Sequence, residues 1–286
     1  MSDPTAVVTL LLLAVIGYVT YRGLRDAAFQ NRYLFSPGEV LGRRQYERLV
    51  TSGFLHLDWV HFGVNAFTLY SFGGPIETAY GPATLLIVFL ASVIGGSLLA
   101  LWLHRNHEYA ALGASGGACG VLFAHIFLLP GGAVMLLFLP IPIPAALYAI
   151  LFLVYEFYGF RRARDNIGHD AHLGGAIVGL LTATALYPWI VPASPRLYGA
   201  VMAAAGAMFV YFYMMGRSPR ADDPWSLPAL RGRLRVFLER RKLAAEKRRD
   251  AQVDRLLAKI SEQGMASLTD REKALLREAT ERRRGR

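Results

Sequence analysis

The chain has 286 residues, 54% of them hydrophobic, and a mean hydropathy of +0.32, which is too apolar for a soluble domain of this length and indicates a membrane protein. Its formal net charge is +10, but residues 217–286 hold 20 of the 31 Lys and Arg and 11 of the 21 Asp and Glu, so the excess belongs to a tail. A single cysteine, Cys119, excludes disulfides within the chain and a cysteine-rich metal site.

Apolar runs along the chain approach the roughly 20 helical residues needed to cross a hydrocarbon core of about 30 Å. The first has no basic n-region and no small-residue cleavage site, so we expect a retained helix rather than a signal peptide. Short connections between most runs favour an antiparallel bundle. The sequence thus predicts seven spans, near 6–21, 54–73, 82–103, 113–129, 143–160, 170–190 and 197–215.

The connection over residues 22–53 is longer and mixes arginines with aromatic residues. A loop of this length with amphipathic content is expected to fold on the membrane surface.

The tail is rich in Arg, Lys and Glu and has helical periodicity. Gly264 suits a helix C-cap, and Thr269 and Glu272 have the spacing of a capping box. We therefore predict a transmembrane domain over 1–216 and a basic helical tail over 217–286 that ends in a small helical hairpin at about 250–282. A solvated helix explains the charge most simply, membrane lipid headgroups come second, and nucleic acid is not expected because no groove-reading motif is present.

Polar side chains inside the spans are the candidates for chemistry, because burying them in lipid is costly without a role. His61 and Asn65 are four residues apart, so they lie on one helix face and can act on one small volume. Amide and imidazole donors could stabilise an oxyanion, although hydrogen bonds that tie helices together would also account for both residues.

Ser115 lies in "GASGG" at the start of the fourth span, where free backbone N–H groups favour an anion. Serine before a helix is also a common N-cap, so the motif alone leaves both interpretations open. Gly113 and Gly117, and likewise Gly116 and Gly120, form GxxxG pairs that would let another helix approach closely.

The sixth span offers a matching smooth ridge, because Ala171, Gly175 and Gly179 recur every four residues. Docking of the two ridges would bring His172 to Ser115, whose proton a histidine can accept and later return to a leaving amine. Asp170 is two residues from His172 and would point away from it, so the pattern indicates a Ser–His dyad without an acid.

These motifs, "HLDWVHFGVN", "GASGG" and "AHLGGAIVG" on the second, fourth and sixth spans, resemble those of the rhomboid family of intramembrane serine proteases over about residues 5–190. "GGPIETAYG", "FLPIPIP" and Arg48 also resemble the family pattern. The tail is similar to a small helical domain of unknown function found on some bacterial rhomboids.

The resemblance implies an all-α, polytopic membrane bundle with a six-helix rhomboid core, one extra C-terminal transmembrane helix and a helical soluble tail. It implies Ser115 as nucleophile, His172 as general base, and His61, Asn65 and the Ser115 N–H as the oxyanion pocket. Gly113 and Gly116 would shape the nucleophile turn. The implied protein is a multi-pass serine endopeptidase of the bacterial cytoplasmic membrane that cleaves transmembrane proteins through an acyl-enzyme, without metal or cofactor.

Two other functions fit part of the pattern. A non-catalytic rhomboid-like scaffold would bind transmembrane clients, but such proteins typically lack the serine or the histidine. A transporter or channel would use the polar groups for permeation, yet these groups cluster at one depth, and no charged residue lies in the middle of a span except Glu77 and Glu156 at the edges. The orientation stays open, since the basic loops place the catalytic face in the cytoplasm and bacterial rhomboids usually open to the outside.

Overall fold

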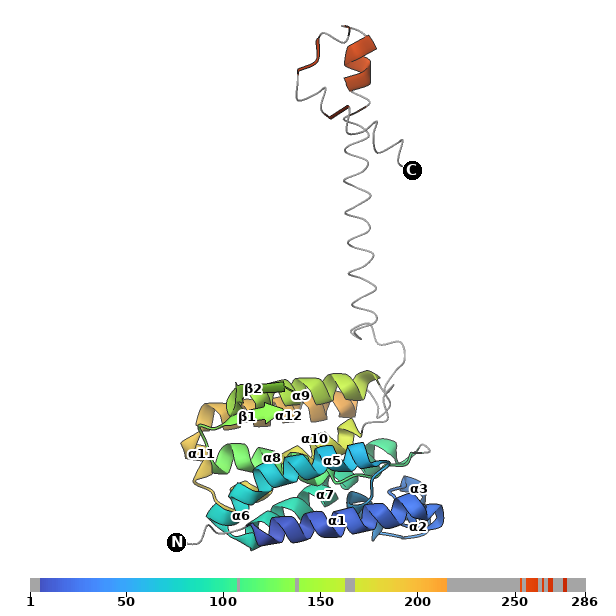
Figure 1. Cartoon of the computed structure of the whole chain (residues 1–286), viewed down its shortest axis with the longest axis vertical. Helices are drawn as coiled ribbons and strands as arrows, with labels where there is room; N and C mark the ends of the chain where they lie inside the picture. Colours follow the sequence, from blue (N-terminus) through green and yellow to red (C-terminus); the bar gives the residue numbers. More distant parts are fainter. Residues whose placement is uncertain are drawn as a thin grey trace. The chain divides into compact units, whose positions relative to one another are not determined.

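The computed structural model describes residues 6–106, 109–136, 139–162 and 168–214, and in the tail residues 253, 256–261, 264, 267–269, 275 and 276. Contacts divide the chain into two compact units, 1–221 and 222–286, and the first contains the helix bundle (Figure 1). The predicted boundary between 216 and 217 stays a prediction.

Each of the seven predicted spans coincides with helix in the described residues, and the predicted helical membrane bundle is confirmed. By length and composition, α1, α7 and α12 could each cross a membrane, while α8 and α9 are shorter apolar helices. The span helices are α1 (Val7–Arg25), α5 (Trp59–Thr68) continued by η2 (Leu69–Gly73) and α6 (Gly74–Tyr80), α7 (Pro82–His104), α8 (Ser115–Leu128), α9 (Ala145–Arg162), α10 (His169–Leu186) and α12 (Pro195–Met214), with the short α11 (Ile190–Ala193) before the last.

The second span is interrupted by the π-helical turn η2 before α6 begins. This turn places Glu77 of α6 at the N-terminus of α1, where its carboxylate accepts hydrogen bonds from the backbone N–H groups of Val8 (2.8 Å) and Thr9 (2.6 Å). A carboxylate there satisfies orphan donors and complements the helix dipole. Glu77 is therefore a helix-end anchor.

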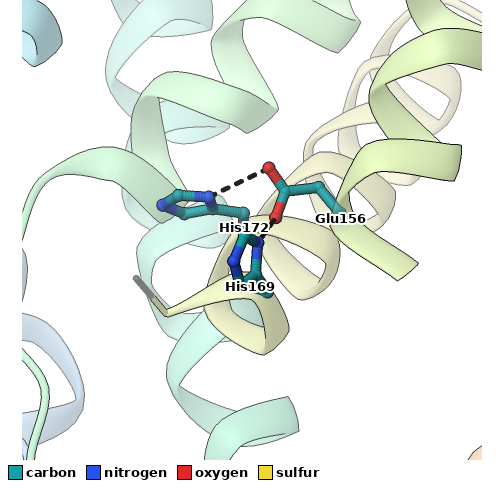
Figure 2. Close-up of side chains that lie close together, drawn as sticks. All are labelled: Glu156, His169 and His172. Atoms are coloured by element: carbon teal, nitrogen blue, oxygen red, sulfur yellow. Dashed lines mark hydrogen bonds and ion pairs between the residues drawn. The ribbon is translucent and has the colours of Figure 1, made fainter. Parts of the chain in front are cut away.

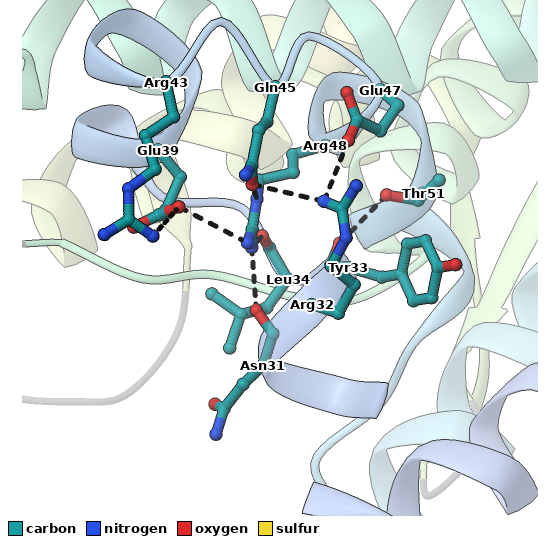
Figure 3. A network of polar contacts seen from close by, with 10 residues as sticks. All are labelled: Asn31, Arg32, Tyr33, Leu34, Glu39, Arg43, Gln45, Glu47, Arg48 and Thr51. Carbon is teal, nitrogen blue, oxygen red and sulfur yellow. Dashed lines mark hydrogen bonds and ion pairs between the residues drawn. The ribbon is translucent and has the colours of Figure 1, made fainter. Parts of the chain in front are cut away.

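The long connection after α1 is folded, as predicted, into α2 (Ala27–Tyr33), α3 (Pro37–Gly42), α4 (Arg48–Thr51) and η1 (Ser52–Phe54). Arg48, only 4% exposed, holds it together (Figure 3). Its guanidinium donates to the carbonyls of Asn31 (2.8 Å) and Leu34 (2.6 Å) and to Gln45 Oε1 (2.7 Å). One buried side chain thus ties the end of α2 to the start of α4.

A two-stranded hairpin between α8 and α9 is a feature that the sequence analysis did not predict. Strands β1 (Ala133–Leu136) and β2 (Leu139–Pro144) pair antiparallel, with Ala133 opposite Pro144 and Val134 opposite Ile143. The "LPIPIP" segment favours extended backbone because proline fixes φ near −65° and lacks an N–H. Both strands contact α9 (Figure 1).

The helix α10 contacts both α7 and α8, and glycines lie at the closest points of these contacts. A Cβ added to Gly175 would collide with the Gly116 carbonyl, and one added to Gly179 would collide with the Gly120 backbone. On the other side, a Cβ on Gly174 would lie 2.9 Å from the Gly95 carbonyl oxygen. The glycine ridges of α8 and α10 are therefore in contact, as the sequence predicted.

Gly117, which the sequence analysis paired with Gly113, faces a different neighbour. A Cβ on Gly117 would collide with the ring of Phe89 on α7. Gly113 lies outside α8, in the turn before it, with φ of +148°. Gly117 therefore admits a neighbouring helix, which is α7 rather than α10, whereas Gly113 shapes the turn before α8.

In the tail, the described residues 256–261 are helical and Gly264 has φ of +78°. Its N–H donates to the Ile260 carbonyl at 2.9 Å, which is the C-cap predicted there. Residues 217–252 and most of the predicted hairpin lie outside the described residues.

We predict that Gly175→Ala lowers the thermal stability of the purified protein in detergent, because the new methyl group has no space against α8. Overpacking of this kind costs about 1–3 kcal/mol. Gly206→Ala in α12 is the control, since nothing lies within 4 Å of a Cβ there. Equal melting temperatures for the two variants would contradict the contact.

We also predict that Arg48→Ala makes the 22–53 connection sensitive to limited proteolysis, because the Asn31 and Leu34 carbonyls lose their donor. An unsatisfied buried polar group costs about 1–3 kcal/mol. Arg43→Ala removes an exposed ion pair to Glu39 and should leave the cleavage pattern unchanged. Cleavage at the same rate in both variants would show that Arg48 does not hold the loop.

Candidate functional site

The turn that leads into α8 is tied to the segment before α5 by two backbone donors. The Gly113 N–H donates to the Ser52 carbonyl at 3.0 Å, and the Ala114 N–H donates to His56 Nε2 at 3.3 Å. The positive φ of Gly113 is a backbone conformation that glycine adopts without strain. The residue before the candidate nucleophile is therefore held at a defined place.

His56 is fully buried and bonds at both ring nitrogens. Because Nε2 accepts from Ala114, Nδ1 carries the proton and donates to Thr20 Oγ1 at 2.9 Å. Thr20 in turn donates to the Phe54 carbonyl at 3.4 Å. His56 thus links α1 to the turn before Ser115 and acts as an anchor of that turn.

Ser115 is the first residue of α8, and the N-cap is Ala114. Because Ala114 and not Ser115 occupies the N-cap position, the N-cap interpretation left open by the sequence has no support. The first return bond of α8 runs from the Ala118 N–H to the Ala114 carbonyl (2.9 Å). The N–H groups of Ser115 and Gly116 precede that bond and have no acceptor in the helix, which suits developing negative charge.

His61 and Asn65 occupy one face of α5, whose N-terminus is capped by Asp58 through a 2.7 Å bond to the His61 N–H. A Cβ on Gly113 would lie 3.0 Å from His61 Nε2 and 3.5 Å from Ser115 Oγ. The imidazole and the hydroxyl therefore flank the same small space, which exists because residue 113 has no side chain. Buried Asn65 donates to the His61 carbonyl at 3.0 Å and retains a second amide hydrogen.

His172 lies in the first turn of α10, and the starts of α8 and α10 touch. A Cβ on Gly116 would lie 3.1 Å from the carbonyl oxygen of Ala171. The neighbour of Ser115 thus contacts the neighbour of His172 across the two helices. Within the described residues no hydrogen bond joins Ser115 to His172, whose side chain is 15% exposed.

A buried carboxylate faces His172, and the sequence analysis missed it. Glu156 Oε1 of α9 lies 3.1 Å from His172 Nδ1, and Oε2 lies 2.7 Å from His169 Nδ1 (Figure 2). The dyad interpretation assumed no acid near His172, and His169 had no role assigned. The available signal was that Glu156 is the one acidic residue in the apolar run 145–160.

Asp170 does not serve His172, as its spacing predicted. It pairs instead with His104 Nε2 at 3.0 Å and accepts a hydrogen bond from the Tyr109 hydroxyl at 3.2 Å. The His104 and Tyr109 rings stack with their centroids 3.9 Å apart. Burial, and secondarily the Asp170 carboxylate, raises the pKa of Tyr109, so its hydroxyl stays a donor.

Glu156, His169 and His172 are also a set of side chains that could hold a metal ion, with ligand atoms within 4.8 Å of one another. In the structure both imidazole Nδ1 atoms contact the carboxylate, and a carboxylate binds them as N–H donors. A protonated nitrogen cannot ligate a metal, so the two Nδ1 atoms serve as hydrogen-bond donors to Glu156 and not as metal ligands. The absence of a metal from the reaction stays a prediction.

Two protein families match parts of this chain. The rhomboid domain matches residues 43–189, just over half of the chain, and a family of unknown function, DUF6576, matches residues 241–282. RHOMBOID-like protein 12, mitochondrial, of Arabidopsis thaliana is 31% identical over 63% of this chain and 58% of its own length. Rhomboid protease GluP of Bacillus subtilis is 29% identical over 61% and 33%, and Rhomboid protease AarA of Providencia stuartii is 24% identical over 73% and 82%.

The chain spans about three fifths of the Arabidopsis protein's length and a third of GluP's. The relatives include mitochondrial, chloroplastic and bacterial proteins, so they support an integral membrane protein and do not support the expected bacterial inner membrane over an organelle. With the helix bundle, the glycine-ridge contact and the 43–189 match, the chain belongs to the rhomboid family of integral membrane proteins.

Proposed function

We propose that this chain is an intramembrane serine endopeptidase that hydrolyses peptide bonds in or near transmembrane segments of membrane proteins. The observation that carries the proposal is that Ser115 begins α8 uncapped, shares the space at Gly113 with His61, and lies where α8 touches the start of α10, which bears His172. The relatives named as rhomboid proteases support the same activity.

In the proposed reaction, His172 Nε2 takes the proton of the Ser115 hydroxyl as its oxygen attacks the scissile carbonyl. Collapse of the tetrahedral intermediate breaks the C–N bond, and the imidazolium gives its proton to the leaving amine. Water then attacks the acyl-enzyme with the same base. The missing Ser115–His172 hydrogen bond is compatible with this, because such bonds are often long before substrate binds.

The oxyanion of the intermediate would be bound by the Ser115 N–H and by side-chain donors on α5. His61 contributes its ring and Asn65 its second amide hydrogen, both from the helix face that borders Gly113. Preorganised donors of this kind act strongly where water is scarce. No cofactor is needed for any step.

The rival functions fit less of the site. A non-catalytic scaffold does not require a serine at the start of α8 next to the start of α10, where a buried carboxylate contacts His172. For a permeation pathway, the two acidic residues would have to be available to ions, but Glu77 is bonded to the end of α1 and Glu156 to two histidines.

We predict that Ser115→Ala and His172→Ala each abolish cleavage of a co-expressed single-span reporter, because each removes a group that moves the proton or forms the acyl bond. A fluorophosphonate probe should label the wild-type protein and not Ser115→Ala. Ser97→Ala on α7 is the matched control and should cleave and label normally. Cleavage by Ser115→Ala, or no labelling of wild type, would favour the scaffold.

We predict that His61→Ala and Asn65→Ala lower kcat with little change in KM, because the donors act mainly on the oxyanion. Loss of one such donor costs about 10²–10³-fold in kcat. The measurement is steady-state cleavage of a transmembrane peptide in detergent micelles. A rise in KM at constant kcat would instead assign these residues to substrate binding.

A further inference from the structure

We propose that Glu156 is a positioning residue for the general base: its carboxylate holds His172 with Nδ1 protonated, leaving Nε2 free to accept the serine proton, while His169 holds the carboxylate. This inference rests on the proposed function and adds Glu156 and His169 as residues that support the Ser115–His172 dyad.

The geometry joins three side chains from two helices. His169 and His172 are three residues apart in the first turn of α10, so their rings lie on one face of that helix. Glu156 reaches them from α9, with one oxygen on each ring (Figure 2). The two bonds fix both the position and the rotation of the carboxylate.

The hydrogen-bond chemistry then fixes the tautomer of His172. An ionised carboxylate only accepts hydrogen bonds, so each Nδ1 in contact with it carries the proton. Neutral His172 must then have an unprotonated Nε2, which is the nitrogen that a general base uses here. After proton transfer, the same carboxylate faces the imidazolium and stabilises its charge, as the acid does in soluble serine proteases.

Helix α9 is shaped for this arrangement. A Cβ on Gly159, one turn after Glu156, would collide with the His169 ring, so only glycine admits that ring against the helix. Glu156 is 2% exposed and His169 is 3% exposed. A carboxylate this deeply buried is costly unless it is paired, and here both of its oxygens are.

A merely structural role is the alternative, in which Glu156 ties α9 to α10 and does not influence the reaction. The two roles separate in kinetics. Loss of a purely structural link between α9 and α10 would lower the folded fraction or change KM. Loss of a positioning residue would instead lower kcat and the reactivity of Ser115 in protein that remains folded.

The experiment uses the full chain in detergent micelles and compares Glu156→Gln with wild type. Glutamine keeps the size but offers one acceptor and one donor, so one imidazole loses its partner. We expect kcat and the rate of fluorophosphonate labelling to fall at least about tenfold, with KM within about twofold; neutralising the acid costs about 10⁴ in soluble triad enzymes. Glu156→Asp, which keeps the charge, should recover part of the rate.

Glu77→Gln is the matched control, because it neutralises another buried carboxylate that is bonded only to the α1 end. It should change the melting temperature and leave kcat unchanged. Wild-type kcat and labelling rate in folded Glu156→Gln, with Ser115→Ala and His172→Ala inactive, would overturn this inference while the protease function stands. Activity in those two variants would instead remove the protease function.

A second measurement needs no Glu156 variant to fold. The ¹⁵N spectrum of histidine-labelled wild-type protein, with His172 assigned by its loss in His172→Ala, reports which ring nitrogen is protonated. We expect a hydrogen-bonded proton on Nδ1 and a bare Nε2. A proton on Nε2 of neutral His172 would overturn the inference.

Discussion

The close approach of α8 and α10 depends on the absence of side chains, because lipid gives helices no hydrophobic reason to associate. Attraction must come from backbone surfaces in direct van der Waals contact, and the Gly116–Gly175 and Gly120–Gly179 pairs provide them. The two helices run parallel from this contact, so their polar first turns come to the same depth. Any larger residue at these positions would separate the helices and, with them, the serine from the histidine.

Around this contact, two buried polar side chains each bond at both of their polar atoms. His56 uses both ring nitrogens to hold the turn before α8, and Glu156 uses both oxygens on the start of α10. Leaving a buried polar group without a hydrogen bond in an apolar medium costs roughly several kcal/mol of folding free energy. The pairing of His56 and Glu156 therefore stabilises this arrangement of the helices over others. The hydroxyl of Ser115 and the N–H groups beside it are left for a substrate.

Much of this could be predicted from the sequence, and the limits have physical causes. Apolar run lengths predicted the seven helices, and the four-residue spacing of small residues predicted the ridge that Gly175 and Gly179 form. The partner of His172 could not be predicted, because residues 145–160 of α9 are apolar apart from Glu156, and such a uniform pattern does not show which face of the helix points toward α10. The β1–β2 hairpin was missed because "LPIPIP" reads as a break between helices rather than as paired strands.

The anchoring of the Gly113 turn has a mechanical consequence. Ser52, whose carbonyl holds the Gly113 N–H, directly follows α4, and α4 begins with Arg48, whose guanidinium clamps the surface connection. The 22–53 connection and the turn before Ser115 are therefore joined through Arg48, α4 and Ser52 by short hydrogen-bonded links. A displacement of the 22–53 connection would therefore be transmitted to the backbone next to Ser115.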